Sequence, residues 1–320
     1  MKRSFWLVLV FIVALALPSV IGEFWVHVAI EILILGLFAV SFNMLFGYMG
    51  QLSFGHAAYF GVGAYATGLL LLKTPLPLPV CFFISMAAAG LAALVFGYFC
   101  VRLTGIYFAI LTMAFGQLIY YIIFQWYAFT GGDNGLQGIV PPGWLLNVRH
   151  YYYFTLFIVI GALVVMWLIS ASPFGHTMRA IRDNAERTRF IGINVRRYML
   201  INFVIAGMFA GLAGGLLGPF NRSIAPDLCN WQQSGIPVFM TVIGGPLAFF
   251  GPMVGAVIYT LLFALITGFT EYWPLTIGLV IILVVLYLPG GVLGLVQKKW
   301  IPLHSKKLTP GPNGGAGEEI

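Results

Sequence analysis

The sequence predicts an all-α integral membrane protein with about ten transmembrane helices arranged in two inverted repeats. Hydrophobic residues make up 61% of the 320 residues, only 8% are charged, and the mean hydropathy is +0.98. A soluble domain of this size does not carry so much apolar sequence. The apolar residues also fall into separate runs, each near the length of about 20 residues that crosses a bilayer. We therefore expect residues 1–300 to form one polytopic transmembrane domain.

Ten apolar runs are candidates for spanning helices. The first follows Lys2 and Arg3 and could be a cleaved signal peptide, but its apolar part is long for that role, so we interpret it as a retained span. Residues 301–320 are rich in proline and glycine and are expected to form a flexible cytoplasmic tail. The predicted spans are 5–22, 27–46, 57–72, 79–101, 105–125, 151–171, 198–218, 234–250, 253–270 and 273–289.

The distribution of basic residues sets the sidedness of these spans. With the N-terminus inside and ten crossings, only Lys73, Arg149 and Arg222 of the 16 basic residues lie outside. If 234–250 did not cross, nine basic residues would lie inside and seven outside. The positive-inside rule therefore favours ten crossings, which place both termini in the cytoplasm. The net charge of +7 follows the membrane side and no groove-binding pattern, so we expect no nucleic-acid partner.

Two spans are irregular and indicate a candidate translocation path. Glycine-rich stretches precede 57–72 and interrupt 234–250, and interrupted spans at matching positions of inverted halves are typical of a transport path. Close helix packing by small residues explains the same glycines equally well. The predicted interruptions lie near 47–72 and 234–252. The candidate path residues are polar residues of the spans and adjoining stretches that could line a path, with two glycines of the second interruption: Asn43, Gln51, Ser53, His56, Gln117, Gly244 and Gly245.

We expect no catalytic residues and no metal site on this chain. Ser53 and His56 lie three residues apart, but no nucleophile motif surrounds Ser53 and no nearby acid is present to orient His56. The three cysteines show no spacing typical of metal ligands and read as small core residues. No nucleotide-binding motif occurs either, so an ATPase that drives transport would have to be another chain.

A basic segment, 172–197, predicts a short cytoplasmic helix. Ser172 and Pro173 are typical of a helix start, Met178, Ile181 and Ala185 follow at helical spacing, and Gly192 is a stop signal. Six arginines lie in the segment. Three interpretations remain open: a docking helix for a soluble partner, a surface for anionic lipid, or a solvated loop whose charge fixes topology.

The outer loops offer a second candidate surface. A glycine-rich turn around Asp133 and Asn134 follows a spanning run, without the strand or the lysine of a phosphate loop. Together with the prolines at 141 and 142 it forms a shaped surface on which a partner could dock.

The sequence resembles the membrane subunits of branched-chain amino-acid ABC transporters, and the M-type permease more than the H-type. The run Phe-Gly-Tyr-Met-Gly-Gln-Leu-Ser-Phe-Gly-His-Ala-Ala-Tyr-Phe-Gly-Val-Gly-Ala-Tyr at 46–65 is similar to the signature of that family. Further matches occur in family order at 130–138, 172–184, 192–194 and 242–245, and the resemblance covers about residues 30–300.

The resemblance implies an importer in a bacterial or archaeal inner membrane. Its partners would be a homologous second permease, two cytoplasmic subunits that bind ATP and Mg, and a periplasmic substrate-binding protein. From the outer loops of this sequence, our own hypothesis is that the binding protein contacts Asp133, Asn134, Arg149 and Arg222. Relatives carry urea, short amides or aromatic acids, so these are alternative substrates, and an ATP-independent secondary carrier is a further alternative.

The resemblance also implies that a coupling helix contacts the ATPase. Importers carry a Glu-Ala-Ala-x-x-x-Gly pattern there, whereas this chain has Arg187 and Thr188 in place of the two alanines between Glu186 and Gly192. The implied coupling residues are Met178, Arg179, Ala180, Ile181, Arg182, Asp183, Asn184, Glu186, Arg187 and Gly192.

Overall fold

A computed structural model describes residues 14–268, 272–288 and 290–294. Its regular elements are helices apart from one pair of two-residue strands, and residues 14–20 are also helical. The longer helices are α2 (Glu23–Asn43), α3 (His56–Lys73), α4 (Leu78–Cys100), α5 (Ile106–Gln125), α7 (Val148–Ala171), α8 (Pro173–Asp183), α10 (Val195–Asn221), α11 (Trp231–Gly244), α12 (Gly251–Ile266) and α13 (Trp273–Tyr287). The short elements are η1 (Met44–Tyr48), α6 (Tyr127–Thr130), η2 (Gly132–Asn134), β1 (Leu136–Gln137), η3 (Gly143–Leu145), α9 (Ala185–Phe190), β2 (Ser223–Ile224) and η4 (Pro226–Cys229).

The described helices confirm an all-α integral membrane protein. The helices for the second to tenth predicted spans each begin within four residues of the predicted start, whereas the first half of 5–22, residues 5–13, lies outside the described residues. By length and composition, α2 with η1, α4, α5, α7 and α10 can each cross a membrane. Helix α3, with 18 residues, is not among these five, and α11, α12 and α13 have 14, 16 and 15 residues. The number of crossings and the inverted relation of the two halves stay predictions.

Exposed apolar side chains identify the surface that faces lipid. Phe83, Leu91 and Val95 on α4 are 73%, 64% and 55% exposed. Ile106 and Ile110 on α5 are 69% and 58% exposed. Patches of this kind are unfavourable in water but favourable in hydrocarbon, so these helices lie at the perimeter of the bundle.

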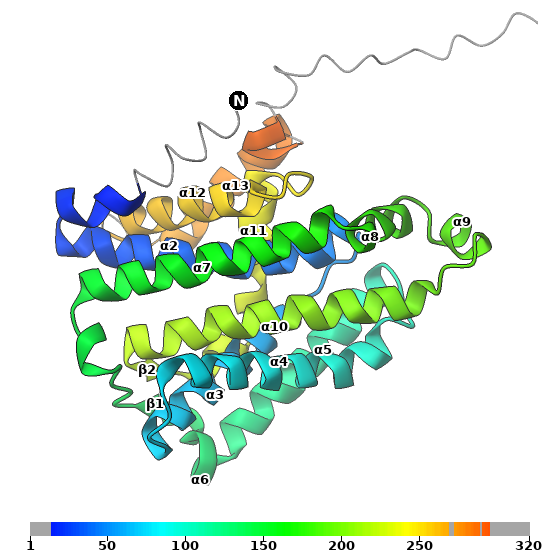
Figure 1. The fold of residues 1–320 in the computed structure, drawn as a ribbon. Coiled ribbons are helices and arrows are strands. Elements are labelled where there is room, and N and C mark those ends of the chain that lie inside the picture. The colour runs from blue at the N-terminus through cyan, green and yellow to red at the C-terminus, as the bar shows by residue number, and fades with distance from the viewer. Residues whose placement is uncertain (1–13, 269–271, 289, 295–320) are drawn as a thin grey trace, which may run out of the picture.

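Helix α10 forms the centre of the bundle, packed on α3, α4 and α2 (Figure 1). Glycines allow this close approach. A Cβ atom on Gly63 of α3 would collide with the backbone of Gly211, and one on Gly214 would collide with the Phe60 carbonyl oxygen. Small residues at such contacts let helix backbones approach closely, which is how helices associate in lipid. Helices α3, α4 and α10 therefore form one tightly packed block.

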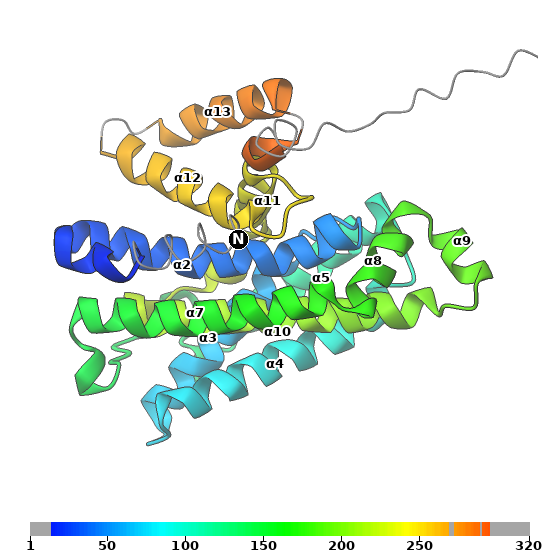
Figure 2. The same ribbon diagram turned by 45° about the horizontal axis from the view of Figure 1, so that its top comes forward.

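Helices α12 and α13 lie on the other side of α2, away from α4 and α5 (Figure 2). Helix α12 packs along α2 and α11, and a smaller apolar core forms there around Ala39, Met240 and Ile243. Helix α2 therefore lies between the α3–α4–α10 block and the C-terminal helices.

Both predicted interruptions are present. After α2 the chain forms one π-helical turn, η1, and then has no regular helix until α3 begins at His56. The second interruption, 245–250, follows α11 rather than falling inside one span, so the predicted span 234–250 ends six residues early, at Gly244. Gly245 adopts φ +108°, a conformation that favours glycine, and Pro246 has no amide hydrogen to continue the helix.

The two ends of the bundle carry different elements. Strands β1 and β2 pair antiparallel at one end, with Leu136 opposite Ile224, near the start of α7. Helices α8 and α9 lie at the opposite end (Figure 1). The basic segment and the outer-loop candidates therefore lie at opposite ends of the spanning helices, as the predicted sidedness requires.

Candidate functional site

The basic segment folds as two helices rather than the single predicted one. Helix α8 begins at Pro173, as predicted, and ends at Asp183. Asn184 has extended dihedral angles, and its side-chain oxygen accepts a hydrogen bond from the Arg187 amide at 2.8 Å, which caps α9. Gly192 ends the segment with φ +89°, and Asn194 caps α10 through the Arg197 amide. The predicted helix stop at Gly192 is confirmed, and the break at Asn184 corrects the prediction of a single helix.

Helix α8 faces the bundle. Met178 and Ile181 are buried, as their helical spacing predicts. Two predicted coupling arginines also turn inward. Arg182 Nη1 donates to the Gly47 carbonyl oxygen at 2.6 Å, and the Arg179 guanidinium lies 5.0 Å from the centre of the Tyr48 ring. These arginines therefore contact the permease chain itself, at the π-helical turn.

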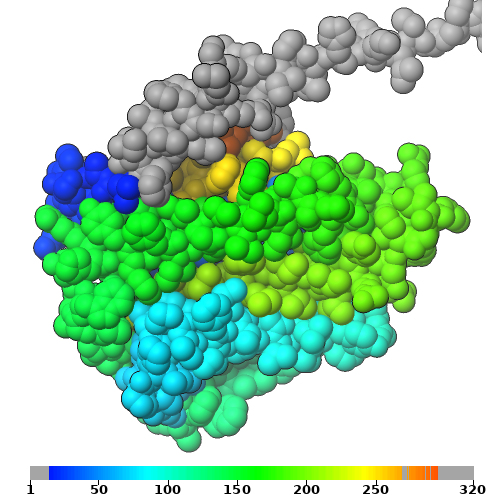
Figure 3. All heavy atoms as spheres, viewed as in Figure 1, coloured from blue at the N-terminus to red at the C-terminus, as the bar shows by residue number. Residues whose placement is uncertain are grey.

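Helix α9 faces outward and projects beyond the packed helices (Figure 3). Glu186, Arg187 and Arg189 are exposed. Phe190 and Ile191 at its end are 90% and 70% exposed. Two large apolar side chains among arginines on a projecting helix are typical of a protein-binding surface. Of the other predicted coupling residues, Ala180, Asp183, Asn184 and Gly192 are exposed.

Three predicted path residues, Asn43, Ser53 and His56, are at most 1% exposed. The Ser41 hydroxyl donates to the Phe38 carbonyl oxygen at 2.7 Å, so His56 Nε2, at 2.9 Å, must donate to the Ser41 oxygen. His56 Nδ1 is then a bare acceptor. It has no hydrogen-bond partner among the described residues. Ser53 Oγ and the amide oxygen and nitrogen of Asn43 also lack one. Ser53 and His56 therefore form no nucleophile–base hydrogen bond.

Sequence reasoning missed two buried polar residues beside this group. Ser234, in the first turn of α11, accepts a hydrogen bond from the Ala57 amide at 2.9 Å, so the N-terminal ends of α3 and α11 meet. Asn202 of α10 donates to the Met44 carbonyl oxygen at 2.7 Å. A polar residue inside the apolar run 198–218 is a signal that could have identified Asn202. No pattern in the sequence places Ser234 against α3.

The other predicted path residues have different neighbours. Gln51 accepts a hydrogen bond from the Gly105 amide at 3.0 Å, next to the start of α5. Gln117 donates to Asn230 at 2.9 Å, beside the start of α11. Gly244 and Gly245 are buried at the second interruption. The structure thus distributes the predicted residues around both interruptions and does not gather them in one open channel.

The two interruptions contact each other. A Cβ atom on Gly47, in the π-helical turn, would collide with the Pro246 carbonyl oxygen. Gly244 and Gly245 in turn lie against the backbones of Gly251 and Gly291. The contact explains glycine at these positions by close backbone approach.

The outer-loop candidates are all exposed at the end opposite α9. Asp133 and Asn134 lie in η2, and Asn134 donates to the Tyr127 hydroxyl at 3.0 Å. Arg149 lies in the first turn of α7, and Arg222 ends α10 with φ +56°. The Arg222 carbonyl oxygen accepts a hydrogen bond from the Ile139 amide at 3.1 Å, and this bond extends the β1–β2 pairing.

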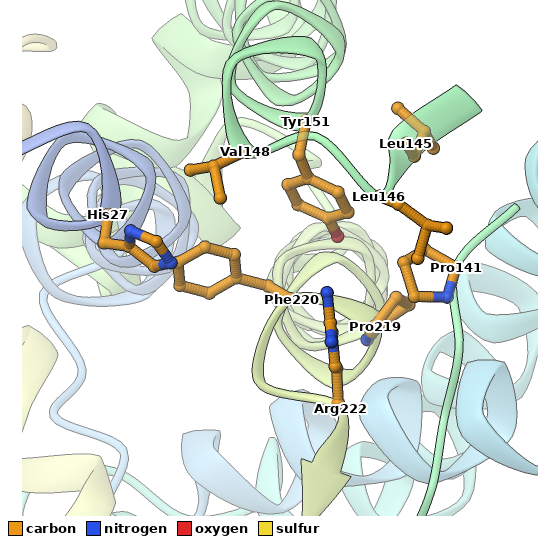
Figure 4. A pocket seen from close by; sticks show the side chains of 9 residues that line it. All are labelled: His27, Pro141, Leu145, Leu146, Val148, Tyr151, Pro219, Phe220 and Arg222. Atoms are coloured by element: carbon orange, nitrogen blue, oxygen red, sulfur yellow. The ribbon is translucent and has the colours of Figure 1, made fainter. Parts of the chain in front are cut away.

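A cavity of about 280 Å³ opens beside Arg222. Figure 4 shows the Tyr151 hydroxyl and the Arg222 side chain directed into the space between Phe220 and Pro141. His27 completes one wall, with its ring 5.5 Å from that of Phe220. None of the predicted path residues lines this cavity. No group of three or more metal-ligating side chains occurs among the described residues.

The sequence matches known transport proteins along most of its length. The sequence model of the family described as "Branched-chain amino acid transport system / permease component" matches residues 24–288. The high-affinity branched-chain amino acid transport system permease protein LivM of Escherichia coli K12 is 26% identical, covering 92% of this chain and 76% of its own length. The permease protein LivH of Salmonella typhimurium is 25% identical, covering 81% and 90%. No solved structure matches the chain significantly.

Proposed function

The chain belongs to the family of permease components of branched-chain amino acid transport systems, and we propose that it is the M-type permease subunit of an ATP-driven importer of leucine, isoleucine or valine. In this proposal it pairs with a homologous second permease in the inner membrane. The similarity to both LivM and LivH supports a pair of related permeases. A periplasmic binding protein delivers the solute, and both termini of this chain are cytoplasmic.

The exposed apolar end of α9 carries the proposal that an ATPase docks here. Phe190 ends α9 and Ile191 follows it, and α9 projects beyond the spanning helices (Figure 1), so in this proposal both exposed side chains lie outside the bilayer. Burying one such side chain against a partner stabilises a complex by about 1.5–3 kcal/mol. The arginines around them favour an acidic partner surface. ATP and Mg are then bound by the two partner ATPases, and this chain supplies no cofactor site or catalytic group of its own.

The buried polar group supports a translocation path near the two interruptions. A buried polar atom without a hydrogen-bond partner costs about 1–3 kcal/mol, so such atoms are retained where they have a use. Asn43, Ser53 and His56 each carry one or more such atoms. In the proposed cycle they meet water or solute when the interruptions separate. Uncharged polar groups suit a zwitterionic or neutral solute, and no buried carboxylate is available there for ion coupling.

Reconstitution tests this function. The chain is placed in liposomes with its second permease, the two ATPases and the binding protein, and uptake of labelled leucine, isoleucine, valine, urea and acetamide is measured with and without ATP. We expect ATP-dependent uptake of the three amino acids. Uptake of urea or acetamide alone would identify the alternative substrate class. Uptake by this chain alone without ATP would identify a secondary carrier and contradict the importer.

The outer surface is tested separately. In the proposed complex Arg149 and Arg222 receive acidic groups of the binding protein, with Asp133 and Asn134 at the same surface. Reversing both charges, Arg149→Glu with Arg222→Glu, should lower the stimulation of ATPase activity by the binding protein several-fold. Lys73→Glu is the control, because this outer cation lies 4.6 Å from the Phe129 ring of its own chain. Unchanged stimulation in the double variant would contradict the docking site.

A further inference from the structure

We propose that Arg182 is a positioning residue that fastens α8 to the first interruption, so that a movement of α8 reaches both interruptions. This inference rests on the proposed function, because an ATPase must move α8 for the linkage to matter. It concerns the side of the segment that faces away from the ATPase. The evidence comes from the contacts of Arg182, of its neighbour Arg179 and of the π-helical turn η1.

All three guanidinium nitrogens of Arg182 are engaged. Nη1 donates to the Gly47 carbonyl oxygen at 2.6 Å, while Nε and Nη2 donate to one carboxylate oxygen of Asp183 at 3.2 and 3.1 Å. Asp183 thereby fixes the plane of the guanidinium and aims its remaining nitrogen at η1. A planar fork with several fixed donors can do this, whereas the ammonium of lysine cannot.

Two further contacts connect α8 to the first interruption, one made by the aliphatic part of Arg182 and one by Arg179. The Arg182 side chain lies so close to Gly50 that a Cβ atom on that glycine would be 2.7 Å from Arg182 Cγ, and Gly50 adopts φ +72°. Arg179 lies over the Tyr48 ring and also donates to the Ser170 carbonyl oxygen at 3.3 Å, at the end of α7. Helix α8 therefore contacts the first interruption at three positions: Gly47 and Tyr48 of η1, and Gly50 just after it.

The π-helical turn also contacts two other parts of the bundle. Gly47 is in backbone contact with Pro246 of the second interruption, and the Met44 carbonyl oxygen accepts from Asn202 of the α3–α4–α10 block. A displacement of Gly47 must therefore displace Pro246 or break the contact. Single π-helical turns occur frequently at functional sites. Gly47 lies in the last turn of this helix, where the carbonyl oxygens have no helical partner, and Arg182 supplies one.

The linkage is tested with Arg182→Lys in the complete reconstituted importer. This substitution keeps the charge and removes the fork. The matched control is Arg102→Lys, an arginine just after α4 on the predicted cytoplasmic side, whose guanidinium lies 4.5 Å from the centre of the Tyr98 ring. The primary readout is the number of solute molecules imported per ATP hydrolysed, with binding of the ATPases measured in the same samples. A second readout, hydrogen exchange of residues 44–56 in nanodiscs, requires no ATPase.

We expect Arg182→Lys to lower the import-to-hydrolysis ratio at least about five-fold, the low end of typical coupling between sites, while ATPase binding stays unchanged. Exchange at 44–56 should become faster. Arg102→Lys should change neither readout. The inference is overturned if Arg182→Lys leaves the ratio at the wild-type value, if Arg102→Lys lowers it equally, or if exchange at 44–56 is unchanged. If the wild-type assembly does not import solute, the proposed function is contradicted instead. Hydrogen exchange at 44–56 then tests by itself whether Arg182 fastens α8 to η1.

Discussion

Helices α8 and α9 are neighbours in one basic segment, yet they present their arginines to different surroundings. Arg179 and Arg182 of α8 contact the ring of Tyr48 and the carbonyl oxygen of Gly47, whereas Arg187 and Arg189 of α9 are exposed. Asn184 separates the two helices. The comparison teaches that a run of like charges need not form one surface, because a single extended residue redirects the helix that follows it.

The largest expected effect is on stability, from reversing the inward charge. Arg182→Glu removes a charged hydrogen bond, leaves the Gly47 carbonyl oxygen unpaired and places a second carboxylate beside Asp183. We expect the free energy of unfolding to fall by about 3 kcal/mol, measured by unfolding the purified chain in mixed detergent micelles. Arg187→Glu is the outward control and should change stability by less than about 0.5 kcal/mol. An equal loss of unfolding free energy in both variants would contradict the assignment of an inward α8 arginine and an outward α9 arginine.

The next effect concerns the end of α9. Phe190→Asp should raise the dissociation constant for the ATPase about 10- to 100-fold, because a large apolar side chain no longer enters the interface. Binding is measured on nanodiscs that hold the permease pair. Because Phe190 is 90% exposed, the stability of the chain should not change. Trp144→Asp, an exposed aromatic residue at the opposite end, is the control. Unaltered affinity in Phe190→Asp would place the docking surface elsewhere.

A smaller effect is expected at the boundary between the two helices. Asn184→Ala removes the side-chain cap of α9 and should cost about 1 kcal/mol of local stability. Hydrogen exchange at Arg187 to Phe190 measures it and should become faster, while exchange in α8 stays the same. The comparison variant is Asn194→Ala, which removes the equivalent cap from α10 and should act on that helix alone. Faster exchange across α8 as well would mean that the two helices form one cooperative unit.

The smallest effect is expected from the outward charges. Arg187→Glu or Arg189→Glu should each weaken ATPase binding by less than about 1 kcal/mol, because exposed charges interact through water. The loss should shrink as salt is raised from low to high concentration, which distinguishes it from the effect of Phe190→Asp. A loss that persists in high salt would show that these arginines become buried in the complex.

Much of the fold could be predicted from the sequence because lipid imposes strong rules on composition. Apolar runs located α2, α4, α5, α7 and α10, glycines located the first interruption, and glycines with proline located the second. The break at Asn184 had a signal that was not used: an asparagine followed by an acidic residue, Glu186, in the first turn is typical of a helix start.

The candidate site was predicted less well, because its contacts join residues distant in sequence. The hydrogen bond from the Ala57 amide to Ser234 spans 177 residues, and the one from Arg182 to Gly47 spans 135. No local pattern distinguishes an arginine that binds a backbone carbonyl from one that faces water. The sequence therefore located the basic segment but not the orientation of its arginines.

The glycine contacts at the centre of the bundle limit which helices can move in a transport cycle. A Cβ atom added at Gly63, Gly207 or Gly214 would collide with a neighbouring helix, so α3, α4 and α10 are in close backbone contact. We therefore expect these three helices to move as one frame in a transport cycle, with the larger displacements in α2, α8, α11 and α12. Spin labels placed in pairs within the frame should report one distance in every nucleotide state, whereas pairs from the frame to α12 should report at least two.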